Sequence, residues 1–442
     1  MFHIDHSDGS DRIEGKNLKT AYTVFEDATV IDGTGNPPLP NAVMVVQGGK
    51  IVAVGAKGDV VIPPVAEKIN VKDHVIMPGL IDAHIHFAGD RYRNYGWILQ
   101  TDPIRLIRAV ADARRLLQSG YTAVRDCGSK NGPPLKRAIE EGTIIGPRTI
   151  AARALITRTG GHFDVRVRHL KDYVDGFLPV DQVNENTLLR LADGPDDCRR
   201  AVREQLREGA DFIKICTGLS GESRLYPEPT PDYTIEEITA MVDEAHQLGV
   251  KVASHAAGKE GIMRAVEAGV DTIEHGSGID EAACKLMVEK DAVFVPTVAV
   301  GIKKLDPQAP LCKEELQDAK IQRKFEAVRL AHSAGVKIAA GSDFGYYQHL
   351  PLGDNALELE ALVASGLSPM DAIVAATRVS AEALGLEREI GTLENGKYAD
   401  LLVLNDNPLE DIGVLRRTLQ IAMVVKNGEI VVNRSRADYE HP

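Results

Sequence analysis

Eight short apolar segments alternate with helical patterns between residues 75 and 341, and this alternation constrains the fold most strongly. Each segment has the length and apolar composition of a buried strand, whereas the stretches between them repeat apolar residues at helical spacing. The segments span residues 75–83, 122–126, 148–156, 212–216, 250–254, 272–274, 293–297 and 337–341. Strands that alternate with helices form a parallel sheet, and eight strands can close a barrel. The sequence therefore predicts an α/β fold with a (β/α)8, or TIM, barrel.

Glycine ends most of the helical patterns between these strands. The patterns cover residues 104–119, 197–208, 235–248, 260–268, 281–290 and 313–333, and five of them are followed by Gly120, Gly209, Gly249, Gly269 and Gly335. These are positions at which a left-handed helix cap favours glycine. An open, doubly wound sheet is the alternative, but it predicts a glycine-rich phosphate loop after an early strand, which this sequence lacks.

The two chain ends have a different pattern, in which short β-rich runs surround turn residues. Residues 22–54 contain several such runs with a Gly48-Gly49 turn, and residues 399–432 repeat the theme around Asn427-Gly428. Such runs indicate hairpins. We therefore expect a tail at 1–20, a composite β-sandwich domain from 21–75 and 390–436, a barrel at 76–389 and a second tail at 437–442.

Charge and cysteine content narrow the classes of partner. The 442 residues carry a formal net charge of -13, which disfavours nucleic acids and anionic membranes as partners. No apolar run is long enough for a membrane span, and the first 20 residues lack a signal-peptide core. The five cysteines are dispersed, which is typical of reduced thiols. We expect a soluble, cytoplasmic protein with a small-molecule substrate.

Six chemically distinctive side chains lie at or near the carboxyl ends of the predicted strands. They are His84, His86, Lys214, His255, His275 and Asp343. Each has an ordinary structural explanation when taken alone: Glu274-His275 resembles a surface ion pair, for example, and Asp343 a turn residue. In a barrel, however, the carboxyl ends of all strands meet at one mouth. Converging imidazoles and a carboxylate are typical ligands of a divalent metal.

The motifs around these residues resemble the amidohydrolase superfamily, and within it the imidazolonepropionase-like and Xaa-Pro dipeptidase-like branch. The resemblance runs from about residue 22 to residue 433. Its motifs occupy residues 78–86, 159–162, 212–214, 255–261, 269–276, 296–297, 341–343 and 390–401. The resemblance implies a distorted (β/α)8 barrel with a composite β-sandwich domain, and often a homo-oligomer.

The resemblance also implies two divalent metal ions, usually zinc. His84, His86 and Asp343 would hold the more buried ion, and His255 and His275 the more exposed one. Lys214 would be carboxylated by carbon dioxide and bridge both ions. Burial disfavours a charged lysine, and the neutral amine can form such a carbamate.

Two metal ions would lower the pKa of a bridging water. The resulting hydroxide would attack the scissile carbonyl, with Asp343 as general base and then general acid. His162 lies in a Gly-Gly-His loop for which the branch implies a catalytic or substrate contact. Tyr226, Tyr233 and His349 are further candidates for substrate binding, and residues 157–195 and 217–233 form long loops that would carry specificity.

These features predict a metal-dependent hydrolase of an amide-type C–N bond, most simply in a dipeptide or an N-acyl amino acid. A hydrolase of xenobiotic amides, carbamates or ureas is the nearest alternative, since fold alone does not decide the substrate. A mononuclear deaminase is a further alternative, but it typically has a glutamate where this chain has Gly258. A Schiff-base lysine enzyme would leave the four histidines without a role. A non-catalytic scaffold is expected only when the metal ligands are lost.

Overall fold

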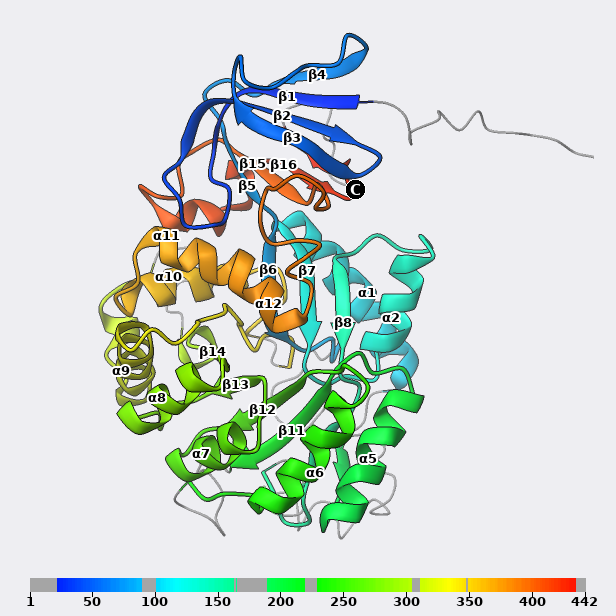
Figure 1. Ribbon diagram of the computed structural model, residues 1–442, viewed down its shortest axis with the longest axis vertical. Helices are drawn as coiled ribbons and strands as arrows, with labels where there is room; N and C mark the ends of the chain where they lie inside the picture. The colour runs from blue at the N-terminus through cyan, green and yellow to red at the C-terminus, as the bar shows by residue number, and fades with distance from the viewer. Residues whose placement is uncertain are drawn as a thin grey trace, which may run out of the picture.

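The computed structural model describes residues 22–89, 101–162, 164, 189–218, 229–303, 311–346 and 349–434. A mixed β-sheet forms one end of the molecule, and an α/β region with parallel strands forms the rest (Figure 1). The predicted tails at 1–20 and 437–442 lie outside the described residues, as does Tyr226. No helix among the described residues has both the length and the apolar character needed to cross a membrane.

Strands from both chain ends join in one eight-stranded sheet. Its strands are β1 (Tyr22–Val30), β2 (Leu39–Gln47), β3 (Lys50–Ala56), β4 (Ala66–Asn70), β5 (Val75–Pro78), β15 (Leu401–Leu404), β16 (Ile421–Lys426) and β17 (Glu429–Asn433). The order is β17-β16-β15-β5-β1-β2-β3, and β4 pairs with β1. Strand β5 lies between β15 and β1, so it links the two ends of the chain. A separate apolar cluster, which includes Phe25, Met44 and Val403, stabilises this sheet.

Among the described residues, nine further strands form two parallel sheets in the α/β region. The first sheet contains β6 (Leu80–Ile85), β7 (Tyr121–Asp126) and β8 (Arg148–Ala151). The second contains, in order, β10 (Leu189–Leu191), β9 (Leu155–Thr157), β11 (Ile213–Gly218), β12 (Val252–Ala256), β13 (Thr272–His275) and β14 (Val293–Val295). Most of these strands are buried along their whole length, as expected for parallel strands covered by helices.

The predicted strand at 148–156 is two strands in the structure. Arg153 adopts a left-handed backbone conformation with φ of +65°, which interrupts an extended chain. Strand β8 before it pairs with β7, and β9 after it pairs with β11. The break therefore moves the chain from one parallel sheet to the other.

The predicted strand at 337–341 is not a ladder strand but connects the far edges of the two sheets. Ala339 N donates to Phe294 O on β14 at 2.9 Å, and Ala83 N on β6 donates to Ala340 O at 2.8 Å. Gly341, and Gly345 just after this segment, let the chain run close to β6. A Cβ atom at Gly345, where φ is +111°, would lie 1.8 Å from His86 O.

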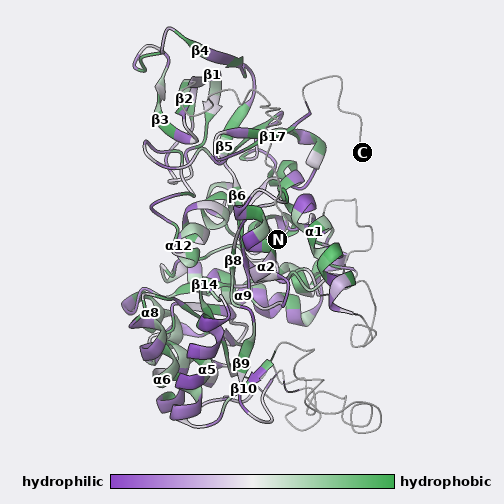
Figure 2. Cartoon of the chain, turned by 90° about the vertical axis from the view of Figure 1, so that its right-hand side faces the viewer, coloured by the Kyte–Doolittle hydropathy of each residue, from purple (hydrophilic) through white to green (hydrophobic). Residues whose placement is uncertain are grey.

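Helices cover the parallel sheets and present polar residues outward. They are α1 (Asp102–Gln118), α2 (Gly132–Glu140), α5 (Pro195–Arg207), α6 (Ile235–His246), α7 (Lys259–Glu267), α8 (Glu281–Glu289), α9 (Ala319–Ser333), α10 (Leu357–Ala364), α11 (Pro369–Val374) and α12 (Ser380–Leu384). Helix α5 buries Cys198, Ala201, Val202 and Gln205, one face at helical spacing. Hydrophilic residues are visible on the outer surfaces of α5, α6 and α8 (Figure 2). Helix α9 begins six residues later than predicted, because the Asp318 side chain caps it.

Candidate metal centre

The structure brings the sequence-predicted metal ligands together: the histidines lie at or next to the carboxyl ends of their strands, whereas Lys214 lies near the start of its strand. His84 lies on β6 and His86 directly follows it, Lys214 lies on β11, and His255 lies on β12. His275 ends β13, and Asp343 lies in the segment that connects β14 to β6. These residues are buried or nearly so, which excludes the surface ion pair considered for Glu274-His275.

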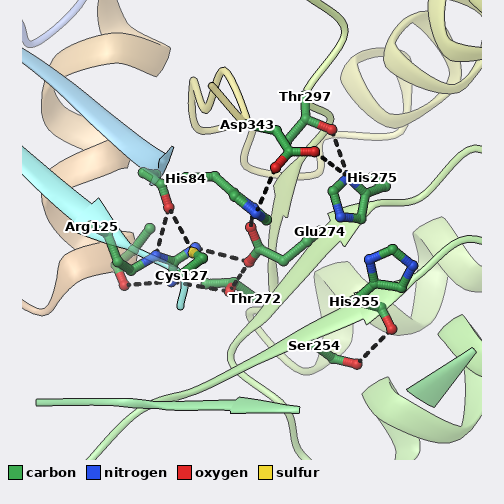
Figure 3. Close-up of polar contacts among 12 residues, drawn as sticks. His84, Arg125, Cys127, Ser254, His255, Thr272, Glu274, His275, Thr297 and Asp343 are labelled. Carbon is green, nitrogen blue, oxygen red and sulfur yellow. Dashed lines mark hydrogen bonds and ion pairs between the residues drawn. The ribbon is translucent and has the colours of Figure 1, made fainter. Parts of the chain in front are cut away.

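Asp343 lies at the centre of the cluster. Its Oδ1 is 3.0 Å from His86 Nε2. The same Oδ1 is 3.5 Å from His84 Nε2, and Oδ2 is 3.9 Å from His275 Nδ1 (Figure 3). The ring of His255 is 4.3 Å from that of His275, measured between centroids. One donor atom from each of His84, His86 and Asp343 lies within 4.8 Å of the others, a separation that one cation can span.

Two of these residues are held in an uncommon backbone conformation. His275 has φ of +71° and Asp343 has φ of +60°, in the left-handed region that non-glycine residues seldom adopt. Such a conformation costs on the order of 1–3 kcal/mol per residue and is typical of functional sites. Local sequence preference therefore does not explain these two turns, and the surrounding structure must hold them.

Hydrogen bonds fix the orientation of the histidine rings. His86 Nδ1 donates to the Gly128 carbonyl at 3.0 Å, which leaves Nε2 facing Asp343. Tyr346 packs against the His86 ring at 4.0 Å and donates its hydroxyl proton to the same carbonyl. His275 Nδ1 contacts Thr297 Oγ1 at 2.7 Å. Such outer partners select the tautomer of a metal-binding imidazole.

The electrostatics favour neutral imidazoles beside an ionised carboxylate. Burial, together with the charge of Lys214, lowers the pKa of His84 to about 4. Burial also lowers the pKa of His275 well below its usual value. For Asp343, burial raises the pKa, but the nearby histidines outweigh this effect and hold its pKa well below normal. Metal binding requires these protonation states of histidine and aspartate.

Lys214 is a buried amine without a hydrogen-bond partner among the described residues. Its side chain is 1% exposed, and among the described residues its Nζ makes no hydrogen bond. Its charge acts on the pKa values of His84, His275 and Glu274, which places it within the same cluster. A buried amine without a partner is costly. The donor set of His84, His86 and Asp343 fits a divalent metal ion.

The residues predicted to contact substrate occupy different environments. His162 is buried and stacks on His255 at 4.1 Å between ring centroids, beside the candidate ligands. Tyr233 lies in the hydrophobic core and donates its hydroxyl proton to Ala192 O, a position that does not favour substrate contact. His349 is exposed. Most of the two long loops lies outside the described residues, so their contribution stays a prediction.

The structure adds residues to the site that the sequence alone did not indicate. Glu274 Oε2 accepts a hydrogen bond from His84 Nδ1 at 2.6 Å, and Arg125 Nη2 donates to Glu274 Oε1 at 2.8 Å. Thr297 contacts His275, and Lys324 donates to Thr297 Oγ1 at 3.2 Å. An arginine inside the buried strand β7 was the available signal, because a buried charge requires a partner.

The sequence model of the Amidohydrolase family matches residues 75–431, which includes every candidate ligand. The chain belongs to the amidohydrolase family. It is 35% identical to an ochratoxinase from Aspergillus niger over 427 residues, which covers 92% of this chain and 86% of that protein. Two solved structures are similar over 93% of this chain. One is a Xaa-Pro dipeptidase with bound methionine, which is 32% identical, is covered over 99% of its own chain and has a TM-score of 0.78. The other is a prolidase complexed with N-methylphosphonate-L-proline, which is 33% identical, is covered over 100% of its own chain and has a TM-score of 0.81.

Membership of this family confirms the resemblance seen in the sequence motifs. The chain is a hydrolase that acts on C–N bonds, and its fold is that of the amidohydrolases. The family is typically metal-dependent, and this chain presents candidate metal-binding residues at the expected place.

Proposed function

We propose that this amidohydrolase uses two zinc ions to cleave the amide C–N bond of a dipeptide or an N-acyl amino acid. The observation that carries this proposal is the buried Nζ of Lys214, which has no hydrogen-bond partner among the described residues and lies in the cluster of four histidines and Asp343. The similarity to an ochratoxinase, a Xaa-Pro dipeptidase and a prolidase supports the substrate class.

The proposed architecture is one distorted (β/α)8 barrel with a β-sandwich domain built from both chain ends. The backbone hydrogen bonds of residues 337–344 support it, since they connect β14 to β6 across one seam between the two parallel sheets. At the other seam, Asp211 N donates to Ala151 O at 2.7 Å.

His84, His86 and Asp343 would hold one ion, and His255 and His275 the other. Lys214, carboxylated on Nζ, would bridge both. The carboxylated lysine would convert a buried donor without a partner into an oxygen ligand, and so remove the cost of burying a free amine. The neutral imidazoles are suited to this role without any change in protonation.

When bound, the two ions would acidify a water molecule and polarise the scissile carbonyl. Asp343 is ionised and partly exposed, so it is placed to take the proton from the attacking water. The same carboxyl group then donates this proton to the leaving nitrogen, as amide cleavage requires. His162, stacked on His255, is placed to contact the substrate carbonyl.

A hydrolase of xenobiotic amides is the second candidate function, because the ochratoxinase is as similar in sequence as the dipeptidases. Both candidates share the same site, and only the group around the scissile bond differs.

Metal analysis followed by a substrate screen tests the proposal. Purified protein is expected to contain about two equivalents of zinc per chain and to hydrolyse some members of a panel of dipeptides, N-acyl amino acids, carbamates and ureas. The Asp343→Asn variant is the matched control, and we expect it to lose hydrolytic activity. Protein that binds no zinc after zinc-supplemented expression would instead support a non-catalytic scaffold. Turnover of carbamates or ureas alone would reject the dipeptide assignment.

A further inference from the structure

A buried ion pair connects the two parallel sheets beneath the candidate metal ligands. Arg125 on β7 and Glu274 on β13 have side chains that are at most 1% exposed, and their nearest charged atoms are 2.8 Å apart. Figure 3 shows Glu274 between Arg125 and His84. Neither residue belongs to the predicted ligand set, so the pair requires its own explanation.

Glu274 determines which nitrogen of His84 carries the proton. An ionised carboxylate can only accept hydrogen bonds, so the 2.6 Å contact requires a proton on His84 Nδ1. The Nε2 lone pair is then free, and it points to the side of the ring where Asp343 lies. Arg125 Nη2 lies 2.8 Å from Glu274 Oε1, and this buried ion pair keeps the carboxylate charged.

Arg125 holds His84 at two points. Its Nε donates to Ala83 O, the carbonyl that precedes His84, at 2.6 Å. Its Nη2 donates to the carboxylate that orients the His84 ring. The other Nη atom donates to Thr272 Oγ1 at 3.2 Å and to Ala383 O at 3.3 Å. One guanidinium therefore fixes both the backbone and the side-chain partner of the same histidine.

We propose that Arg125 and Glu274 are positioning residues that hold His84 in the Nδ1–H tautomer, so that Nε2 stays available to a metal ion. Because Glu274 directly precedes His275, one strand orients a ligand of one predicted ion and supplies a ligand of the other. This inference rests on the proposed function for its metal, but the tautomer itself is a property of the metal-free protein.

The donors around Glu274 make a specific prediction for the amide variant Glu274→Gln. Arg125 and Thr272 donate to Oε1, and His84 donates to Oε2, so all partners require an acceptor. An amide has only one oxygen, and the fixed guanidinium of Arg125 selects it. The amide NH2 group would then face His84 and force the proton onto Nε2. The double variant Arg125→Met/Glu274→Gln removes this constraint, so the amide can turn its oxygen back to His84.

The test measures the His84 tautomer and zinc affinity in the same variants. Proton–nitrogen correlation spectra of ¹⁵N-histidine-labelled, zinc-free protein report the tautomer, with the His84 signal assigned from a His84→Gln variant. Zinc affinity is measured by competition with a chromophoric chelator. Arg148→Met is the control, because Arg148 starts β8 and pairs with Asp400, which belongs to the mixed-sheet end of the molecule.

We expect Glu274→Gln to invert the tautomer and to weaken one of the two zinc sites by about 10- to 100-fold. The double variant is expected to regain the Nδ1–H form and most of the lost affinity, and Arg148→Met to match the wild type. A Glu274→Gln variant with the wild-type tautomer and unchanged affinity would overturn the proposal. Equal losses in the single and double variants, without a change of tautomer, would also overturn it, because a merely structural pair predicts that pattern.

Two further outcomes are decisive. If Glu274→Gln does not fold, the Arg125→Met/Glu274→Leu variant carries the test, because it removes both charges together with the acceptor for His84 Nδ1: loss of the Nδ1–H form supports the proposal, and its retention overturns it. If wild-type protein binds no zinc, the two-zinc function fails, whereas the tautomer measurement on zinc-free protein still tests the positioning role.

Discussion

Replacing Lys214 with methionine should stabilise the zinc-free protein, although it removes a predicted metal ligand from the site. The Lys214 side chain is fully enclosed, and its Nζ makes no hydrogen bond among the described residues. A buried polar group without a partner costs about 1–3 kcal/mol. Methionine has a similar length and unbranched shape, so it should keep the packing while it removes this cost.

The gain can be expressed as a change in melting temperature. An unfolding entropy of about 2.1 cal/mol/K per residue gives roughly 1 °C per kcal/mol for a chain of 442 residues that unfolds as one unit. We therefore expect the melting temperature of zinc-free Lys214→Met to rise by about 1–3 °C. With zinc present the order should reverse, because the wild type alone would retain the bridged site and gain stability from bound metal.

Calorimetry of zinc-free protein in bicarbonate-free buffer measures the effect. Lys426→Met is the matched control, because Lys426 is partly buried but donates to Gly146 O at 2.8 Å. Loss of that hydrogen bond should lower the free energy of unfolding by about 1 kcal/mol, whereas Lys214→Met should raise it. A zinc-free Lys214→Met protein that melts below the wild type would refute the reasoning, since it would mean that the interaction of the amine with Glu274 outweighs the cost of burying it.

Three other substitutions test separate parts of the structure. His162→Ala should lower kcat by about 100-fold or more with zinc content unchanged, and loss of zinc would instead make His162 a ligand. Glu358 is buried, which raises its pKa from 4.5 to about 7. Between these pH values the folded state keeps a proton that the unfolded chain releases. The free energy of unfolding should therefore fall as pH rises from about 4.5 to 7, by about 3 kcal/mol in total. Urea titrations across this pH range should show that Glu358→Gln lacks this fall. If the free energy of unfolding changed with pH equally in the variant and the wild type, Glu358 would not be the group responsible. Gly345→Ala should destabilise the protein by about 3 kcal/mol or more, because its Cβ would overlap His86 O; an unchanged melting temperature would contradict the close approach.

The strands and helices were largely predictable, because their signals are local. Apolar runs located most strands, and left-handed glycines such as Gly120 and Gly249 end helices where the sequence placed them. The break at Arg153 was not predictable, because residues on both sides of it have similar strand character and partners distant in sequence determine the turn. The bridging role of residues 337–341 also depends on long-range contacts that periodicity does not report.

The candidate site was predictable to the extent that strand ends converge. The sequence placed His84, His275 and Asp343 at such ends, and the structure brings them together. It did not indicate the left-handed turn at Asp343 or the contact between Glu274 and His84, because both depend on neighbours from other strands. Side chains outside helices and strands, such as His349, lack any periodic constraint, and this explains why their roles were the least determined.

Gly79 alone separates strand β5 of the mixed sheet from strand β6, which carries His84. The sheet on which β5 rests is completed by β15, more than 300 residues later in the chain. Trimming the protein to its parallel-strand region would therefore remove the anchor of its own ligand strand. Anyone who grafts this catalytic unit onto another protein, or builds chimaeras between relatives, must transfer both chain ends together and place crossovers in surface loops instead.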